Sequence, residues 1–305
     1  MELLKVLLVV YCIIFLFNVI GNSLVIYIIW KKQSSQRTST DYLMLNMAGA
    51  DLIFGVFVLI LQFLIFSILF IPNSYKIIFD DVLFCRLFTT GDIALAAHVD
   101  STFTMLILSV ERYFAVCRPH SFKKWFSKRN VKFSVVLCWI LSLAMVLPRS
   151  SGQSCSSWSR DLVKTLSVIS MVFLMVTLLI IAALSVNIYL TLWWKHTTIQ
   201  PTAAREIQER KMKKRVTLCV LAVIVTYIFL NIPLYICYVL YVFHLITELE
   251  TVVKLAHITI FLSFINSSLD PYMYSFQNQR MRKLFKAIFT CKEREDLTQE
   301  QTLGQ

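Results

Sequence analysis

The stretch Glu111-Arg112-Tyr113 decides how the rest of this sequence is interpreted. It places an acid beside a base near the end of a long apolar segment that runs from about residue 83 to residue 116. Such a segment is long enough to cross a bilayer whose hydrocarbon core is ~30 Å thick. Because an ionisable group is costly to keep in a membrane span, we treat the pair as a functional-site hypothesis.

The composition points to a protein that faces lipid. Of the 305 residues, 57% are hydrophobic and only 16% are charged, whereas a soluble domain carries about 25% charged residues. The net charge of +12 suggests a nucleic-acid partner at first. The basic residues fall between the apolar runs, however, which is typical of membrane orientation and not of nucleic-acid binding.

Seven apolar windows are long enough to span a bilayer as helices. They cover about residues 4–30, 42–70, 83–116, 132–149, 162–194, 214–243 and 251–276. The first run is too long for a signal peptide, so we expect it to stay in place. No internal repeat is visible, so residues 1–290 are expected to form one domain, an all-α membrane protein with a seven-transmembrane helix bundle.

The distribution of Lys and Arg predicts the orientation of the chain. Counting Arg112, 23 of the 30 Lys and Arg residues lie on the side that holds the C-terminus. By the positive-inside rule the C-terminus is cytoplasmic and the N-terminus is outside. We therefore expect a multi-pass protein of the plasma membrane.

The residues after the last span predict a surface helix. Residues 277–290 alternate basic and apolar side chains in the pattern of an amphipathic helix that lies on the inner leaflet. Cys291 follows it and is either palmitoylated or a free thiol; both alternatives stay open. Residues 291–305 form a polar cytoplasmic tail that we expect to be disordered.

Other spans carry one marker residue or motif each, and each marker is weak alone. They are Gly21-Asn22, Asp51, Trp139, Pro233 and Asp270-Pro271-Tyr272-Met273-Tyr274. Together with Glu111-Arg112-Tyr113, and in this order, they resemble the rhodopsin-like (class A) family of G-protein-coupled receptors. The order of residues 37–42 at the start of the second span resembles neuropeptide-type members.

This resemblance implies a receptor that binds an extracellular ligand and activates heterotrimeric G proteins. Its activation switch would comprise Glu111, Arg112, Tyr113, Tyr189, Asp270, Pro271 and Tyr274. Several positions depart from the family pattern, among them Ile181 where the fifth span usually has a proline. Asn231 replaces the usual Trp, Tyr227 the usual Phe, and Lys213 the acid that often pairs with Arg112. Because Arg112 then loses one partner, the sequence predicts raised basal signalling.

The resemblance also implies a polar core and a disulfide. The core would place Asp51 in the family's sodium pocket with Asn22, Ser101, Asn266, Ser267 and Asp270. Oxygen ligands suit a hard cation such as Na⁺, although a hydrogen-bonded cluster without an ion, or a protonated Asp51, stays open. No other cofactor is expected. Cys85 and Cys155 lie outside the membrane, where disulfides form, and the family pairs these two positions.

The ligand pocket is less determined by the sequence. Asp92 follows Cys85 at the spacing of the acid in amine receptors, but a count back from Arg112 puts Ala94 there. Because two residues turn a helix by about 200°, Asp92 has three open alternatives: it contacts a cationic ligand, caps the helix or faces water. Amide and aromatic groups suit a peptide or small organic ligand. Those expected in the pocket are Gln62, Asn231, Tyr235 and Tyr238.

We therefore expect a receptor for a short peptide, with membrane lipids as further partners. A biogenic-amine receptor of the same family is one alternative. A membrane transporter is an alternative from another class, but transporters usually show internal repeats and paired broken helices, which are not visible. An enzyme is not expected, because the 5 His residues are scattered and share no span.

Overall fold

The computed structural model describes residues 2–70, 91–150, 160–198, 204–242, 245–246 and 248–275. Across these ranges the chain is mostly helical and contains no strand. Seven long helices and one short helix, α6, follow one another. They are α1 (Glu2–Lys31), α2 (Ser39–Phe70), α5 (Asp92–Cys117), α6 (Pro119–Trp125), α7 (Lys128–Ser150), α8 (Arg160–Thr198), α9 (Ala204–Val242) and α10 (Leu249–Ser275). The predicted all-α fold is confirmed.

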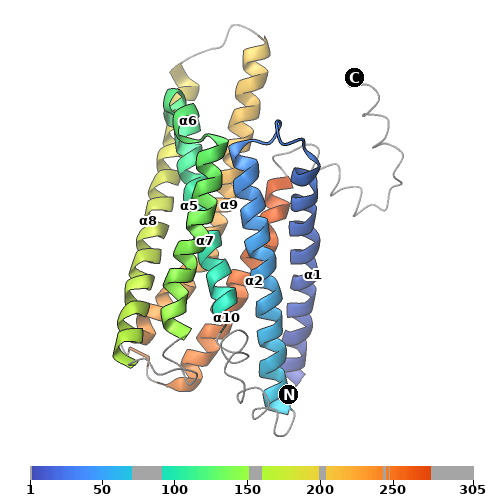
Figure 1. Ribbon diagram of the computed structural model, residues 1–305, viewed down its shortest axis with the longest axis vertical. Helices are drawn as coiled ribbons and strands as arrows, with labels where there is room; N and C mark the ends of the chain where they lie inside the picture. The colour runs from blue at the N-terminus through green and yellow to red at the C-terminus, as the bar shows by residue number, and fades with distance from the viewer. Residues whose placement is uncertain are drawn as a thin grey trace, which may run out of the picture.

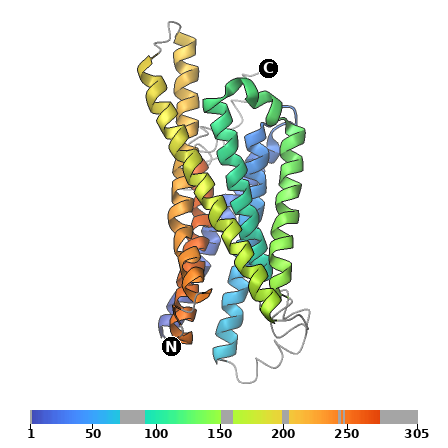
Figure 2. The same cartoon turned by 90° about the vertical axis from the view of Figure 1, so that its left-hand side faces the viewer.

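The long helices run side by side as one bundle (Figures 1 and 2). Helix α5 lies at its centre, in contact with α2, α7, α8 and α9. The apolar stretch of α5 is 72% buried, whereas those of α1, α2, α7 and α8 are 22–33% buried. Consistent with this central position, α5 carries more of the buried polar side chains than any other described helix.

Five of the described helices are long and apolar enough to cross a membrane. Their membrane-length segments are Lys5–Lys31, Ser39–Ser67, Asp92–Cys117, Lys128–Val146 and Val168–Thr191. Helix α9 contributes a shorter apolar segment, Leu221–Cys237. Large apolar side chains such as Phe229 and Leu179 are 78% and 66% exposed. Because water would disfavour so much exposed apolar surface, lipid is its natural surroundings, and the chain is a multi-pass membrane protein.

Two helices begin at positions that differ from the expected ones. Helix α5 starts at Asp92 and not at residue 83, because Gly91 has a φ of +68°, a left-handed conformation that ends helical continuity. Helix α9 starts at Ala204, before the expected residue 214. With α8 it projects beyond the other helices at the end of the bundle that holds α6 (Figure 2).

Helix α6 was not expected from the sequence. It begins at Pro119, directly after Arg118, and proline is well suited to the first helical position because its ring fixes φ and its missing N–H has no partner there. The short helix connects α5 to α7 at the end of the bundle where α5 carries Glu111-Arg112-Tyr113 (Figure 1).

Two glycines let neighbouring helices approach α1 closely. A Cβ on Gly21 would lie 2.9 Å from Cγ of Pro271, and one on Gly55 would lie 2.7 Å from Oδ1 of Asn18. Both distances are too short for real side-chain contacts, so α1 packs against the backbone of α2 and buries its own glycine against α10. This packing brings the polar residues of α1, α2 and α10 into one region.

Several predictions concern residues that the structure does not describe. Cys85, Cys155, the helix at 277–290, Cys291 and the tail at 291–305 lie outside the described residues. The helices that hold Lys213, Tyr238 and Tyr274 are described, but their side chains are not. The disulfide, the surface helix, the palmitoylation and the roles of these three side chains stay predictions.

Candidate functional site

Glu111 and Arg112 form an ion pair near the end of α5. Glu111 is fully buried. Its Oε2 atom accepts a hydrogen bond of 2.8 Å from Nε of Arg112 and lies 2.7 Å from Nη2 of the same residue. A carboxylate buried to this extent is stable only when its charge and its lone pairs are matched, and Arg112 supplies half of that match.

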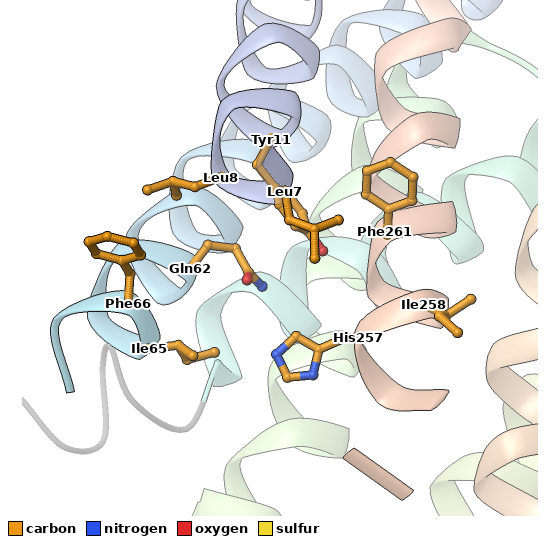
Figure 3. Close-up of a pocket in the computed structure, with 9 residues that line it drawn as sticks. All are labelled: Leu7, Leu8, Tyr11, Gln62, Ile65, Phe66, His257, Ile258 and Phe261. Carbon is orange, nitrogen blue, oxygen red and sulfur yellow. The ribbon is translucent and has the colours of Figure 1, made fainter. Parts of the chain in front are cut away.

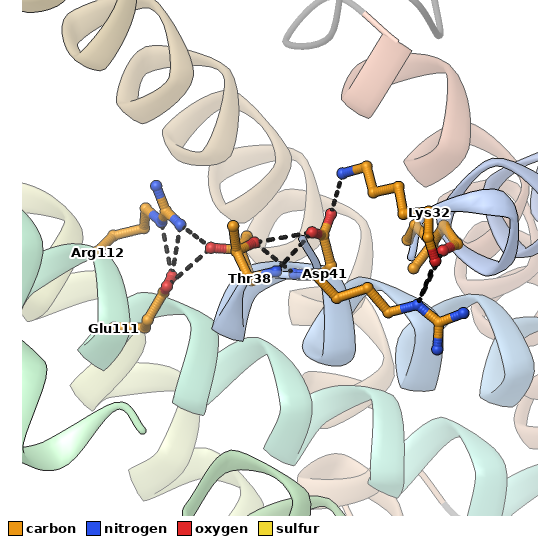
Figure 4. A network of polar contacts seen from close by, with 8 residues as sticks. Lys32, Thr38, Asp41, Glu111 and Arg112 are labelled. Atoms are coloured by element: carbon orange, nitrogen blue, oxygen red, sulfur yellow. Dashed lines mark hydrogen bonds and ion pairs between the residues drawn. The ribbon is translucent and has the colours of Figure 1, made fainter. Parts of the chain in front are cut away.

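The other half comes from the start of α2. The hydroxyl groups of Ser39 and Thr40 donate hydrogen bonds of 2.9 and 2.8 Å to Oε1 of Glu111. The Thr40 hydroxyl also accepts a hydrogen bond from Nη2 of Arg112. We call these four residues, Ser39, Thr40, Glu111 and Arg112, the α2–α5 clamp. Figure 4 shows its ion pair, Glu111 with Arg112.

A second hydrogen-bonded group fixes the start of α2. The Thr38 hydroxyl accepts a bond of 3.2 Å from the Asp41 backbone N–H, and the Thr38 backbone N–H donates a bond of 2.8 Å to Oδ2 of Asp41. This is a capping box, which satisfies backbone groups at a helix start. Asp41 also lies 2.7 Å from Nζ of Lys32 (Figure 4). The capping box therefore holds Ser39 and Thr40 in place.

The loop between α1 and α2 is also tied to its neighbours. Nη2 of Arg37 donates a bond of 2.8 Å to the carbonyl of Trp30 at the end of α1. Nζ of Lys128, at the start of α7, donates to the carbonyls of Ser34 and Ser35 at 3.1 and 2.8 Å. Carbonyls at the end of a helix need such partners. The loop before the α2–α5 clamp is thus bonded to both α1 and α7.

The remaining switch residues are placed less tightly. Tyr113 is half-buried and its ring contacts that of Phe114 at 5.9 Å. Tyr189 is 52% exposed on α8. Pro271 is buried against Gly21. Tyr113 and Tyr189 therefore lack the full burial that marks Glu111, whereas Pro271 is buried.

A second acidic region, which we call the polar core, lies deeper in the bundle. Asp51 of α2 is 1% exposed, and Ser101 of α5 donates a hydrogen bond of 3.4 Å to its Oδ1 atom. Nδ2 of Asn22 donates bonds of 3.1 Å to the carbonyls of Ser267 and Asn18. The residues that the resemblance grouped here are therefore all buried, on α1, α2, α5 and α10.

Several oxygens of the polar core have no hydrogen-bond partner among the described residues. They are Oδ2 of Asp51, both carboxyl oxygens of Asp270 and Oδ1 of Asn266. The carboxyl groups of Asp51 and Asp270 lie close enough to interact electrostatically. Because unpaired buried carboxyl oxygens are costly, this arrangement suits a cation or bound water, both of which offer charge or hydrogen bonds to oxygen.

A third buried acid, Asp100, joins three helices. Nδ2 of Asn46 donates bonds of 2.7 Å to Oδ2 of Asp100 and 2.8 Å to Oγ1 of Thr104. Nε1 of Trp139 donates a bond of 2.9 Å to Oδ1 of Asn46. One carboxyl oxygen of Asp100, Oδ2, is thus bonded. The other has no partner among the described residues.

Two of the residues expected in the ligand pocket lie inside the bundle. Nδ2 of Asn231 donates to the carbonyl of Tyr227 at 2.9 Å, and Oδ1 accepts from Ser263 at 3.0 Å. Asn231 thereby holds α9 to α10. Tyr235 is 2% exposed, and a hydrogen bond between Tyr227 and Thr102 links α9 to α5. That hydroxyl is what Tyr227 adds where the family usually has Phe.

The other two described pocket residues lie toward the end of the bundle that holds the N-terminus. Asp92 is the first residue of α5 and only 8% exposed, so the water-facing alternative is wrong. Gly91 holds the cap position, and the acid in the first turn is favoured by the helix dipole. Gln62 lines a cavity between α1, α2 and α10 with Tyr11 and His257 (Figure 3). A shared ligand pocket for these residues stays a prediction.

Comparison with known proteins identifies the family. Residues 21–274 match the 7 transmembrane receptor (rhodopsin family). The chain belongs to this family. It is therefore a receptor and not an enzyme, and its helices form the seven-transmembrane bundle that the sequence predicted.

The receptor is also similar to individual relatives across most of its length. Galanin receptor 2b of Danio rerio is 25% identical over 294 residues, which are 93% of this chain and 74% of that receptor. Somatostatin receptor type 4 of Rattus norvegicus is 26% identical, with 93% and 72% covered. Substance-K receptor of Canis lupus familiaris is 25% identical, with 92% and 74% covered. The predicted similarity to neuropeptide-type members of class A is confirmed.

Proposed function

We propose that this receptor binds a short extracellular peptide and activates a heterotrimeric G protein in the cytoplasm. The α2–α5 clamp carries the proposal, because a fully buried acid and an arginine held by two hydroxyls form an element that can exist open or closed. The similarity to galanin, somatostatin and substance-K receptors supports the peptide. The receptor would lie in the plasma membrane with its N-terminus outside, as the Lys and Arg distribution predicts.

Activation would proceed as a shift between two packings of the bundle. The peptide must bind the active packing more tightly than the resting one. Helix α9 is held in the resting packing by the bonds of Tyr227 to Thr102 and of Asn231 to Ser263. When they rearrange, Arg112 would leave Glu111 and contact the G protein together with Tyr189 and Tyr274.

We also propose that the polar core holds Na⁺ in the resting packing. Asp51, Asp270 and Asn266 offer unpaired oxygens, and oxygen is the preferred ligand of a hard cation. A positive ion would offset the repulsion between the two carboxyl groups.

The proposal is tested by nucleotide exchange on purified G proteins. The full-length receptor in lipid nanodiscs is exposed to a library of neuropeptides that includes galanin, somatostatin and substance-K, with Arg112→Ala as the inactive control. We expect at least one peptide to accelerate exchange with the native chain and not with the control. No acceleration by any ligand, or by the receptor alone, would reject the proposal.

The amine alternative is tested in the same assay with an amine library. Asp92, at the start of α5, is 8% exposed and is the acid that a cationic ligand would contact in the amine alternative. Two results together would show that the ligand is an amine and not a peptide. All peptides would be inactive, and an amine agonist would lose potency with Asp92→Ala.

A further inference from the structure

Two cavities lie on the same two helices, α1 and α10. The first has a volume of about 150 Å³ and is lined by Leu7, Tyr11, Gln62, His257, Ile258 and Phe261, among others (Figure 3). The second has a volume of about 360 Å³. Its lining includes Ile14, Phe17, Ile265, Leu269 and Tyr272. Most of the side chains that line the two cavities are apolar.

The helical repeat places the two cavities end to end. Leu7 and Ile14 are two helical turns apart on one face of α1, and Ile258 and Ile265 are two turns apart on one face of α10. Two turns correspond to about 10 Å along the helix axis. The cavities therefore follow one line, which we call the α1–α10 seam.

The seam borders the lipid-facing surface of the bundle. Leu7 and Phe17 of α1 are 41% and 46% exposed, and Ile258 and Leu269 of α10 are 54% and 40% exposed. An apolar molecule in the membrane can therefore reach the seam sideways. A long, narrow, apolar site of this kind fits a hydrocarbon chain better than the polar backbone of a peptide, because a peptide would bury unpaired N–H and C=O groups there.

The side-chain amide of Gln62 in the first cavity carries an unpaired hydrogen-bond donor. Gln62 is only 9% exposed, and its Nε2 atom has no hydrogen-bond partner among the described residues. Its amide points into the cavity between Leu7 and His257 (Figure 3). Because Nε2 carries two N–H groups and no lone pair, the group that satisfies it must be an acceptor.

The charges at the mouth favour an anionic acceptor. Lys5 lies one helical turn before Leu8, and Lys254 lies one turn before His257, so both precede the cavity on their helices. Both lysines are exposed. We propose that the α1–α10 seam binds a long-chain fatty acid, whose carboxylate accepts from Gln62 near the lysines and whose acyl chain lies along the seam toward Phe17 and Tyr272.

Binding to the seam is measured without peptide and without G protein, so its outcome is separate from the outcome of the exchange assay. Full-length receptor in phosphatidylcholine nanodiscs is photolabelled with a 16-carbon fatty acid that carries a diazirine and an alkyne, and labelled peptides are mapped. We expect saturable labelling of α1 and α10 that palmitate competes away. Labelling that rises linearly with probe, as for lipids around any membrane protein, would overturn the proposal.

Substitutions with a matched control locate the site. Leu7→Trp should fill the first cavity and reduce labelling at least about tenfold, since a tryptophan removes the volume an acyl chain needs. Val9→Trp is the control, because Val9 is 57% exposed on the same helix and lies outside the lining. Ile258→Trp repeats the test from α10, and the melting temperature of each variant reports folding. Equal labelling of folded Leu7→Trp, Ile258→Trp and Val9→Trp would contradict the site.

The headgroup is tested by competition. Gln62→Leu should raise the palmitate concentration for half-competition about tenfold, because a hydrogen bond to a charged group is lost. Hexadecanol, which has the chain without the charge, should compete at least about tenfold more weakly than palmitate. Equal competition by hexadecanol, or stronger competition by lysophosphatidate, would overturn the assignment of a fatty carboxylate.

Discussion

Glu111 and Asp51 are both fully buried carboxyl groups in a membrane bundle, yet their surroundings differ. Every oxygen of Glu111 is matched: Oε1 by Ser39 and Thr40, and Oε2 by Arg112. Oδ1 of Asp51 accepts a hydrogen bond of 3.4 Å from Ser101, and Oδ2 has no hydrogen-bond partner among the described residues.

The difference indicates two kinds of control. In the α2–α5 clamp, protein groups bond both carboxyl oxygens of Glu111. The clamp therefore opens only when the helices move. The polar core is incomplete, so its stability depends on what enters from solution. The first region is expected to set basal activity, and the second to make the resting packing sensitive to ions.

The largest expected effect comes from removing the acid of the clamp. Glu111→Ala leaves the guanidinium of Arg112, whose side chain is 12% exposed, without its counter-ion. Breaking a buried ion pair in this way costs about 3–5 kcal/mol, which should appear as lower thermal stability and higher ligand-free nucleotide exchange. Glu111→Gln keeps the acceptor for Ser39 and Thr40 and should be affected less. Equal behaviour of both variants and the native chain would show that the clamp does not hold the resting packing.

The next effect tests whether the polar core is completed by an ion. Na⁺ at 100 times its dissociation constant would stabilise the receptor by about 2.7 kcal/mol, and Asp51→Asn should abolish that stabilisation. The measurement is the melting temperature in NaCl against choline chloride at equal ionic strength. If Na⁺ still raises the melting temperature of Asp51→Asn, the ion binds elsewhere. If Na⁺ does not raise the melting temperature of the native chain, water and not an ion completes the polar core.

A smaller effect distinguishes the two hydroxyls of the clamp. Ser39→Ala and Thr40→Val each remove one hydrogen bond to Glu111, and a hydrogen bond to a charged group contributes about 1.5–3 kcal/mol. Thr40→Val should raise ligand-free exchange more than Ser39→Ala, because Thr40 also accepts from Arg112. Ser67→Ala is the matched control, since the Ser67 hydroxyl is bonded to a backbone carbonyl of its own helix. The opposite order of the two variants would contradict the assigned geometry.

The smallest effect concerns the missing acid on α9. Lys213→Glu would supply a carboxylate in the helix where related receptors often have one, and a partly exposed ion pair contributes about 1 kcal/mol or less. We expect ligand-free exchange to fall modestly. Lys211→Glu, two residues away and hence on another face of α9, serves as the control. A fall of equal size in both variants would reflect net charge and not a contact with Arg112.

The sequence predicted the order of the spans because apolar length is a strong signal, and it predicted Glu111 and Arg112 because they are adjacent. It did not predict that Ser39 and Thr40 complete the clamp. They lie 72 and 71 residues from Glu111, and no local rule connects positions that far apart. One local signal was missed: Thr38 and Asp41 have the spacing of a capping box, which marks the start of α2.

The ligand region was harder to predict for a physical reason. Asn231 was expected in the pocket because amide and aromatic side chains together are typical of ligand-binding sites. A side chain on a bundle helix can serve its neighbours equally well, and Asn231 bonds to Tyr227 and Ser263. The sequence predicted that Gln62 lines a pocket. It did not predict that α1 and α10 form the other walls of the cavity, because those two helices meet through close packing at Gly21. That packing is visible only in three dimensions.

The projection of α8 and α9 has a practical consequence for imaging. Each is a 39-residue helix, and both continue beyond the rest of the bundle (Figure 2). A continuous helix transmits rotation and translation, so a soluble four-helix protein joined between Thr198 and Ala204 would inherit a fixed orientation. Such a rigid fiducial would give electron cryomicroscopy particles a feature outside the micelle for alignment.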